Sequence, residues 1–124
     1  MNTLLWIIAG VLAAIFLAAG LMKLTQPKAK LAEAGMVWVE GVDPKAVKAL
    51  GALEVLGAIG LIVPAAVDIV PVLVPLAASG LVVVMIGAVI THARLKESPM
   101  VALNVVLLAL AGFVAWGRFG PHSF

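Results

Sequence analysis

The sequence contains no cysteine and no tyrosine, and charged residues make up only 11% of its 124 residues. Without cysteine, the chain has no disulfide, thiolate metal site or iron–sulfur cluster of its own. It also lacks a metal-spaced histidine pair and a phosphate-binding glycine loop, so no metal site is expected. Its eight basic residues mostly flank apolar runs, which indicates orientation in a membrane rather than binding to nucleic acid.

Apolar residues are what the sequence has in excess. They make up 65% of the chain, and the mean hydropathy is +1.25, whereas about half is typical of soluble domains. A chain this short cannot hide so much apolar surface when it folds in water, because a small domain buries only part of itself. We therefore expect lipid to be the solvent.

Four apolar runs are long enough for membrane-spanning helices, since a bilayer core about 30 Å thick requires roughly 20 residues of helix. The runs are residues 3–23, 46–63, 72–92 and 100–118. Pro64, Pro71 and Pro99 lie where these helices should end or begin. The predicted fold class is all-α, an integral membrane four-helix bundle that forms a single transmembrane domain over residues 1–124.

The connection between the first two runs is the longest, and it predicts an amphipathic cytoplasmic segment. A short helix is expected from Lys28 to Ala34, and the apolar residues 36–39 would lie on the membrane surface. Asp43 and Pro44 then predict the N-cap and the first residue of the second spanning helix. A simple tether is the alternative interpretation of this connection.

Lysine and arginine are distributed unequally between the two sides of the predicted bundle. One side has only Arg118. The connections on the other side, with their flanks, contain Lys23, Lys28, Lys30, Lys45, Lys48, Arg94 and Lys96. Because cytoplasmic loops of membrane proteins are enriched in these residues, we predict that both basic loops are cytoplasmic and that the N- and C-termini lie outside.

Glu54 is the only acidic residue within the four predicted spans. A carboxylate at that depth costs several kcal/mol unless it is paired or protonated, so it marks a candidate functional site. On a helix, Gly51, Gly57, Ala58 and Leu61 share its face. Small residues allow another helix to approach closely, and we therefore expect Glu54 to point into the bundle.

Four other polar residues fall in the same half of the predicted bundle. Lys23 and His92 close the first and third runs, Arg94 follows directly, and Asn104 lies in the fourth run. Their convergence predicts a pocket in which Lys23, Glu54 and His92 are catalytic and Arg94 and Asn104 bind ligand, with an almost purely apolar outer half as support. Structural explanations stay open: snorkelling bases, a capping histidine, an interhelical asparagine, or an ion pair between Lys23 and Glu54.

The same residues carry a resemblance to a known family. The matching pieces are Gly20-Leu-Met-Lys-Leu-Thr-Gln-Pro27, Gly51-Ala-Leu-Glu-Val-Leu-Gly-Ala-Ile-Gly-Leu61 and Met85-Ile-Gly-Ala-Val-Ile-Thr-His92. In order and spacing they resemble the DoxX-like family of small bacterial four-span membrane proteins. The resemblance implies a four-helix fold in the bacterial inner membrane, with Lys23, Glu54 and His92 in its polar core. It also implies that some relatives are subunits of quinone-linked oxidoreductases.

Three functions follow from these observations as hypotheses. The leading one is a pocket for a lipophilic molecule, with a quinone as first candidate and haem bound through His92 as a weaker one, in an accessory subunit of a membrane redox system. The second is a stand-alone membrane enzyme in which Glu54 and His92 perform acid–base chemistry such as isomerisation or epoxide opening. The third is a structural assembly protein without a ligand. Self-association through the small residues Ala14 and Ala18, or membership of a membrane complex, is expected in each case.

Overall fold

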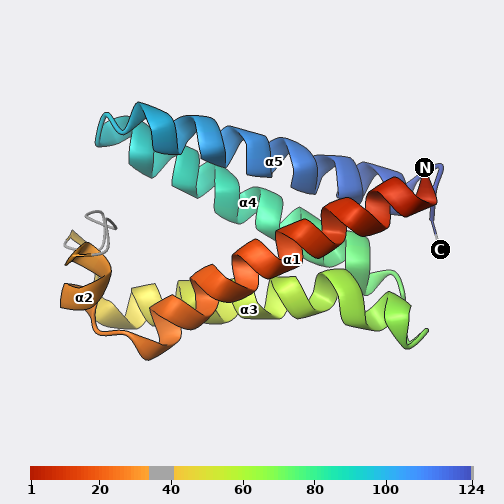
Figure 1. The fold of residues 1–124 in the computed structure, drawn as a ribbon, viewed down its shortest axis with the longest axis horizontal. Coiled ribbons are helices and arrows are strands. Elements are labelled where there is room, and N and C mark those ends of the chain that lie inside the picture. The colour runs from red at the N-terminus through yellow and green to blue at the C-terminus, as the bar shows by residue number, and fades with distance from the viewer. Residues whose placement is uncertain (34–40, 124) are drawn as a thin grey trace.

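The computed structural model describes residues 1–33 and 41–123, which form five helices and no strand within those ranges. The helices are α1 (Asn2–Thr25), α2 (Lys28–Glu33), α3 (Pro44–Ala66), α4 (Leu73–Arg94) and α5 (Ser98–Phe119), as Figure 1 shows. The short helix expected after the first span is present as α2. The apolar residues 36–39 of the predicted amphipathic segment lie outside the described residues.

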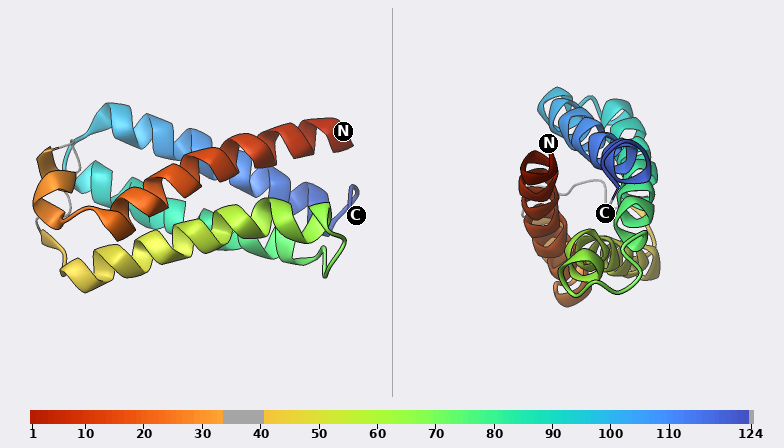
Figure 2. Two further views of the ribbon diagram at one scale, coloured as in Figure 1. Left: turned by 60° about the horizontal axis from the view of Figure 1, so that its bottom comes forward. Right: turned by 90° about the vertical axis from the view of Figure 1, so that its right-hand side faces the viewer.

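The four long helices form a bundle of two antiparallel pairs. Helix α1 packs along α3, and α4 packs along α5, while α3 also packs on α4 and α1 meets α5 more sparsely. The helix α2 and the α4–α5 turn lie at one end, which we call the α2 end, and both termini lie at the other, which we call the terminal end. Helices α1 and α5 are close at the terminal end and diverge toward the α2 end (Figures 1 and 2).

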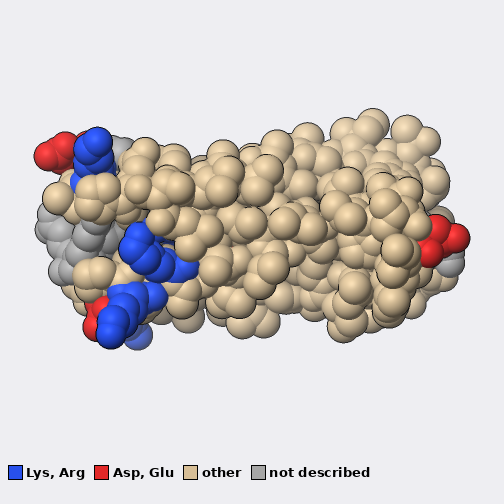
Figure 3. Space-filling model, turned by 90° about the horizontal axis from the view of Figure 1, so that it is seen from below, with Lys and Arg blue, Asp and Glu red and all other residues tan. Residues whose placement is uncertain are grey.

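The four long helices have the length and composition of membrane spans. Each is at least 22 residues long, and their most apolar windows have mean hydropathies between 2.0 and 2.6. At 1.5 Å per residue, 22 residues of helix extend about 33 Å, which is enough to cross a bilayer core. Figure 3 shows a broad uncharged band on one face between the two ends, with lysine and arginine gathered at the α2 end. The all-α fold class with four spanning-length helices is therefore confirmed.

Proline and aspartate define the helix ends, with one departure from expectation. Asp43 caps α3, because its Oδ1 accepts a hydrogen bond of 2.8 Å from the backbone N–H of Lys45. Pro64 does not end α3, which continues to Ala66. A proline disturbs the helical turn that precedes it, through its missing N–H and its ring, and it leaves its own carbonyl free to accept a hydrogen bond. The Pro64 carbonyl accepts from the backbone N–H of Ile69 at 2.9 Å.

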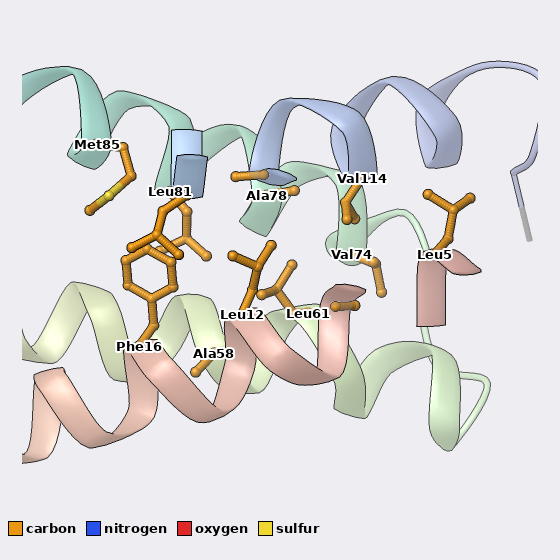
Figure 4. Close-up of a cluster of buried hydrophobic side chains, with 13 residues drawn as sticks. Leu5, Leu12, Phe16, Ala58, Leu61, Val74, Ala78, Leu81, Met85 and Val114 are labelled. Atoms are coloured by element: carbon orange, nitrogen blue, oxygen red, sulfur yellow. The ribbon is translucent and has the colours of Figure 1, made fainter. Parts of the chain in front are cut away.

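The apolar core fills the terminal-end half and the middle of the bundle. Leu12, Leu61 and Ala78 come from three helices and are almost completely buried against one another in one cluster. Figure 4 shows Phe16 of α1 lying below Leu81 of α4 at the edge of this cluster that faces the α2 end. Beyond that edge the two helix pairs separate, and the polar residues begin.

Candidate functional site

Two glycines bring the backbones of α1 and α3 into contact at the start of the polar half. A Cβ atom placed on Gly20 would lie 2.6 Å from the carbonyl oxygen of Gly51, and one placed on Gly51 would lie 2.8 Å from that of Gly20. Real Cβ atoms do not approach so closely, so only glycine fits at either position. The crossing therefore depends on a pair of glycines, in agreement with the expectation that small residues on the Glu54 face admit another helix.

The contact at these glycines places Lys23 beside Glu54. A Cβ atom on Gly51 would meet the Cβ of Lys23 at 2.8 Å, so the lysine side chain begins one helical turn from Glu54. Its Nζ lies 2.8 Å from Glu54 Oε1, and the two side chains are only 8% and 4% exposed. This distance is typical of a charge-assisted pair, and a carboxylate oxygen has lone pairs left to accept a further hydrogen bond.

His92 has a partner that sequence reasoning missed. Its Nδ1 lies 3.2 Å from Oε1 of Glu97, the residue that precedes α5. The backbone N–H of Glu97 also donates to the His92 carbonyl at 3.0 Å, because the chain turns tightly between α4 and α5. The sequence placed His92 in the same pocket as Glu54, and the structure adds this local contact with the start of α5. A carboxylate five residues after a helix-ending histidine was the available signal.

Asn104 is buried on α5 with an unused hydrogen-bond donor. The residue is 5% exposed, and its Nδ2 has no hydrogen-bond partner among the described residues. A buried amide without a partner costs roughly 1–3 kcal/mol, so such a group requires an explanation. A ligand with a hydrogen-bond acceptor would supply one.

These side chains meet at a cavity of about 470 Å³ whose walls come from all four long helices. Its polar wall residues are Lys23, Glu54, Thr91, His92 and Asn104. Phe16, Met85 and Leu107 contribute apolar walls and also belong to the core cluster, so the cavity begins where that core ends. The structure thus brings together four of the five residues singled out in the sequence, and it adds Thr91.

Arg94 is the fifth of those residues, and the structure places it elsewhere. It lies exposed in the last turn of α4 and does not line the cavity. Ligand binding by Arg94 stays a prediction, and the geometry of the cavity does not support it.

Lys23 also borders a second hollow of about 500 Å³ at the α2 end. This hollow lies between the end of α1, the short helix α2 and the start of α3, and it includes Thr25, Gln26 and Lys48. The Nζ of Lys48 donates to the Leu24 carbonyl at 3.0 Å, which ties the start of α3 to the end of α1. The ion pair of Lys23 and Glu54 therefore lies between this hollow and the cavity enclosed by the four long helices.

The terminal end differs from the apolar support that was expected there. Arg118 is 5% exposed, and its guanidinium donates to the His122 carbonyl at 2.9 Å. Its Cζ lies 6.0 Å from the centroid of the Trp6 ring, and the His122 ring meets Trp116 edge-on at 6.0 Å. These contacts tie the C-terminal residues to the ends of α1 and α5, so Arg118 contributes to structure at this end.

Comparison with known proteins agrees with the resemblance seen in the sequence. A family model described as the DoxX-like family matches residues 7–114, which include every polar residue of the cavity wall. The chain therefore belongs to the DoxX-like family and is a multi-pass membrane protein. No curated protein and no solved structure is significantly similar to it.

Proposed function

We propose that the cavity holds the polar head of a lipophilic molecule, that this molecule is a quinone, and that the chain acts as an accessory subunit of a membrane redox system. The observation that carries the proposal is the 470 Å³ cavity between four helices, with polar side chains from each helix on an otherwise apolar wall. Volumes of about 300–1,000 Å³ with few polar groups are typical of small-molecule sites.

Burial of the polar groups supports a ligand rather than a purely structural assembly. A structural ion pair between Lys23 and Glu54 needs no open space beside it, and a structural bundle would pack Asn104 against an acceptor. Here the ion pair and Asn104 Nδ2, which has no partner within residues 1–33 and 41–123, border the same cavity. Charged groups inside a membrane usually mark a pathway or a ligand site.

The chemistry of the wall suits a quinone. Quinone carbonyls accept hydrogen bonds, and the wall offers Asn104 Nδ2, the Lys23 ammonium and the His92 ring. The apolar wall fits a ring and the start of an isoprenoid chain. Haem has less support, because His92 is the single imidazole on the described wall and its Nδ1 already binds Glu97.

An accessory role follows from the composition. The chain has no cysteine, so it has neither a redox thiol nor iron–sulfur ligands, and electrons for a quinone would come from a partner subunit. The exposed residues Ala14 and Ala18 on α1 provide a small-residue face for that partner or for a second copy. The basic side chains at the α2 end support an orientation with that end in the cytoplasm of a bacterial cell.

Quinone binding is tested by titrating the purified protein in detergent with a short-chain ubiquinone. Glu54→Gln removes the charge that holds Lys23 in the wall, and we expect its affinity to fall by roughly tenfold or more. Glu33→Gln makes the same chemical change at an exposed carboxylate of α2 and should bind as the wild type does. Wild-type affinity in a correctly folded Glu54→Gln protein would contradict the proposal.

A second candidate function rests on the contact between His92 and Glu97. A histidine whose Nδ1 is held by a carboxylate is the arrangement used for general bases, and His92 borders the cavity together with Glu54. A stand-alone enzyme for isomerisation or epoxide opening on a hydrophobic substrate would use this pair. Turnover of such a substrate by the purified protein, without partner or cofactor, and its loss in Glu97→Gln would favour this function.

A further inference from the structure

The wall of the cavity reaches the lipid-facing surface of the bundle between α1 and α5. These helices touch at the terminal end, where a Cβ atom on Gly117 would lie 2.8 Å from Cδ1 of Leu5. Toward the α2 end they diverge (Figures 1 and 2). The cavity wall there includes Ile15, Met100 and Leu103, which are 40%, 37% and 48% exposed. We call these three residues the α1–α5 opening.

A second stretch of exposed wall lies between α3 and α4, where Val83 borders the cavity. This side is more firmly closed along its length. A Cβ atom on Gly57 would lie 2.8 Å from Leu81, and one on Gly60 would lie 2.8 Å from Ala77. Helices α3 and α4 are therefore in close contact through the middle of the bundle, whereas α1 and α5 have sparse contacts.

Asn104, whose Nδ2 has no hydrogen-bond partner in the described part of the chain, lies on the α5 side of the cavity. Leu103 is its neighbour in sequence, and Met100 lies one helical turn before it. A head group that accepts a hydrogen bond from Asn104 Nδ2 would therefore lie directly behind the α1–α5 opening.

We infer that the cavity receives only the head of its ligand and that the ligand's long apolar chain leaves through the α1–α5 opening into the bilayer. The ligand class is a membrane-dissolved amphiphile that binds from the lipid phase. This inference rests on the proposed function, and it adds the route by which the ligand enters and the place where its apolar chain lies.

Size and chemistry both support this arrangement. A cavity of 470 Å³ encloses a drug-sized molecule, so a chain long enough to keep a lipid in the membrane must continue outside it. The opening is lined by aliphatic side chains, which an isoprenoid or acyl chain contacts without removing water from a polar group. The charged wall residues Lys23 and Glu54 remain inside, where they meet the head.

The inference is tested with two ubiquinones that share a head group, one with a single isoprene unit and one with several. Binding is measured to the purified full chain in lipid nanodiscs, for the wild type and for Ile15→Trp/Leu103→Trp, which fills the α1–α5 opening. A second variant, Leu50→Trp/Val83→Trp, enlarges wall residues on the α3–α4 side. The matched control is Val11→Trp/Val106→Trp, which adds the same bulk at exposed positions of α1 and α5 that do not line the cavity.

We expect the Ile15→Trp/Leu103→Trp protein to bind the long-chain quinone roughly tenfold more weakly and the short-chain quinone within about twofold of the wild type. The control should bind both quinones within about twofold of the wild type. Helicity and monodisperse elution establish folding, and Ile15→Phe/Leu103→Phe replaces the tryptophan variant if it fails that check.

Equal losses for both quinones, or no loss for either, would overturn the inference while leaving quinone binding intact. A selective loss of the long-chain quinone in Leu50→Trp/Val83→Trp would overturn it in favour of the α3–α4 side. A wild type that binds neither quinone would instead refute the proposed function, and the inference would fall with it.

Discussion

The two halves of the bundle are built from the same four helices but differ in what fills the space between them. In the terminal-end half, Leu12, Leu61 and Val114 interlock and leave almost no exposed surface on their side chains. In the α2-end half, the helix pairs separate around a cavity whose wall includes Lys23 and Glu54. The comparison indicates that packing in the terminal-end half holds the helix pairs in place. The α2-end half can therefore accommodate polar groups whose burial costs free energy.

Removing one member of the buried ion pair should have the largest effect on stability. Lys23→Met leaves Glu54 without its cation, and we expect a loss of about 3–5 kcal/mol of unfolding free energy, since a buried unpaired charge costs that much. The double variant Lys23→Met/Glu54→Leu should recover most of this loss, because the charge is then absent as well. Reversible unfolding in detergent and SDS micelles measures both values. A double variant as unstable as the single one would show that the pair itself stabilises the α2-end half.

A cavity made in the terminal-end half should destabilise the protein without changing quinone binding. Leu12→Ala removes a side chain with 0% exposure, and we expect a loss of about 2–5 kcal/mol. Leu4→Ala, at an exposed position of the same helix, is the control and should change stability by less than about 1 kcal/mol. The same unfolding assay measures stability, and quinone titration measures binding. Weaker quinone binding in a folded Leu12→Ala protein would show that the two halves are coupled.

A side chain at the contact of Gly20 with Gly51 should push α1 and α3 apart. Gly51→Ala places a Cβ atom 2.8 Å from the Gly20 carbonyl oxygen, so α1 must move away from α3, at a cost of about 1–3 kcal/mol. Gly80→Ala on α4 meets nothing within 4 Å and should stabilise the helix by roughly 0.5–1 kcal/mol. The comparison of these two alanines by thermal unfolding isolates the close approach from the general helix preference for alanine. Equal effects at both positions would contradict a backbone contact between α1 and α3.

Making the α2-end half more apolar should raise the stability of the protein slightly and weaken quinone binding. Asn104→Leu replaces an amide whose Nδ2 has no partner within the described residues, and we expect a gain of about 1 kcal/mol together with at least a tenfold loss of quinone affinity. Asn2→Leu, at an exposed position of α1, should change neither quantity appreciably. Unfolding and titration are measured on the same preparations. A loss of stability in Asn104→Leu would show that Asn104 is a structural contact between helices.

Sequence alone was sufficient for the architecture. Run length, hydropathy and the positions of proline and charge predicted four spanning-length helices, and the α1, α3 and α5 helices contain the ranges expected for them. Helix α4 begins one residue later than its run. Depth along the bundle was also predictable, because position within a span of known length determines it. For this reason Lys23, Glu54, His92 and Asn104 were all assigned to the same half.

The direction in which each side chain points around its helix required the tertiary structure. Lipid-facing and buried faces are almost equally apolar in this chain, so the usual amphipathic pattern that assigns a face is weak. Local turns and helix contacts decided that His92 binds Glu97, that Arg94 lies outside the cavity, and that Arg118 is buried beside Trp6. The sequence by itself thus determined which residues share a level in the membrane, because hydropathy and length act along the helix axis. Only the packing of α1, α3, α4 and α5 decided which of those residues meet, and where the space between them opens.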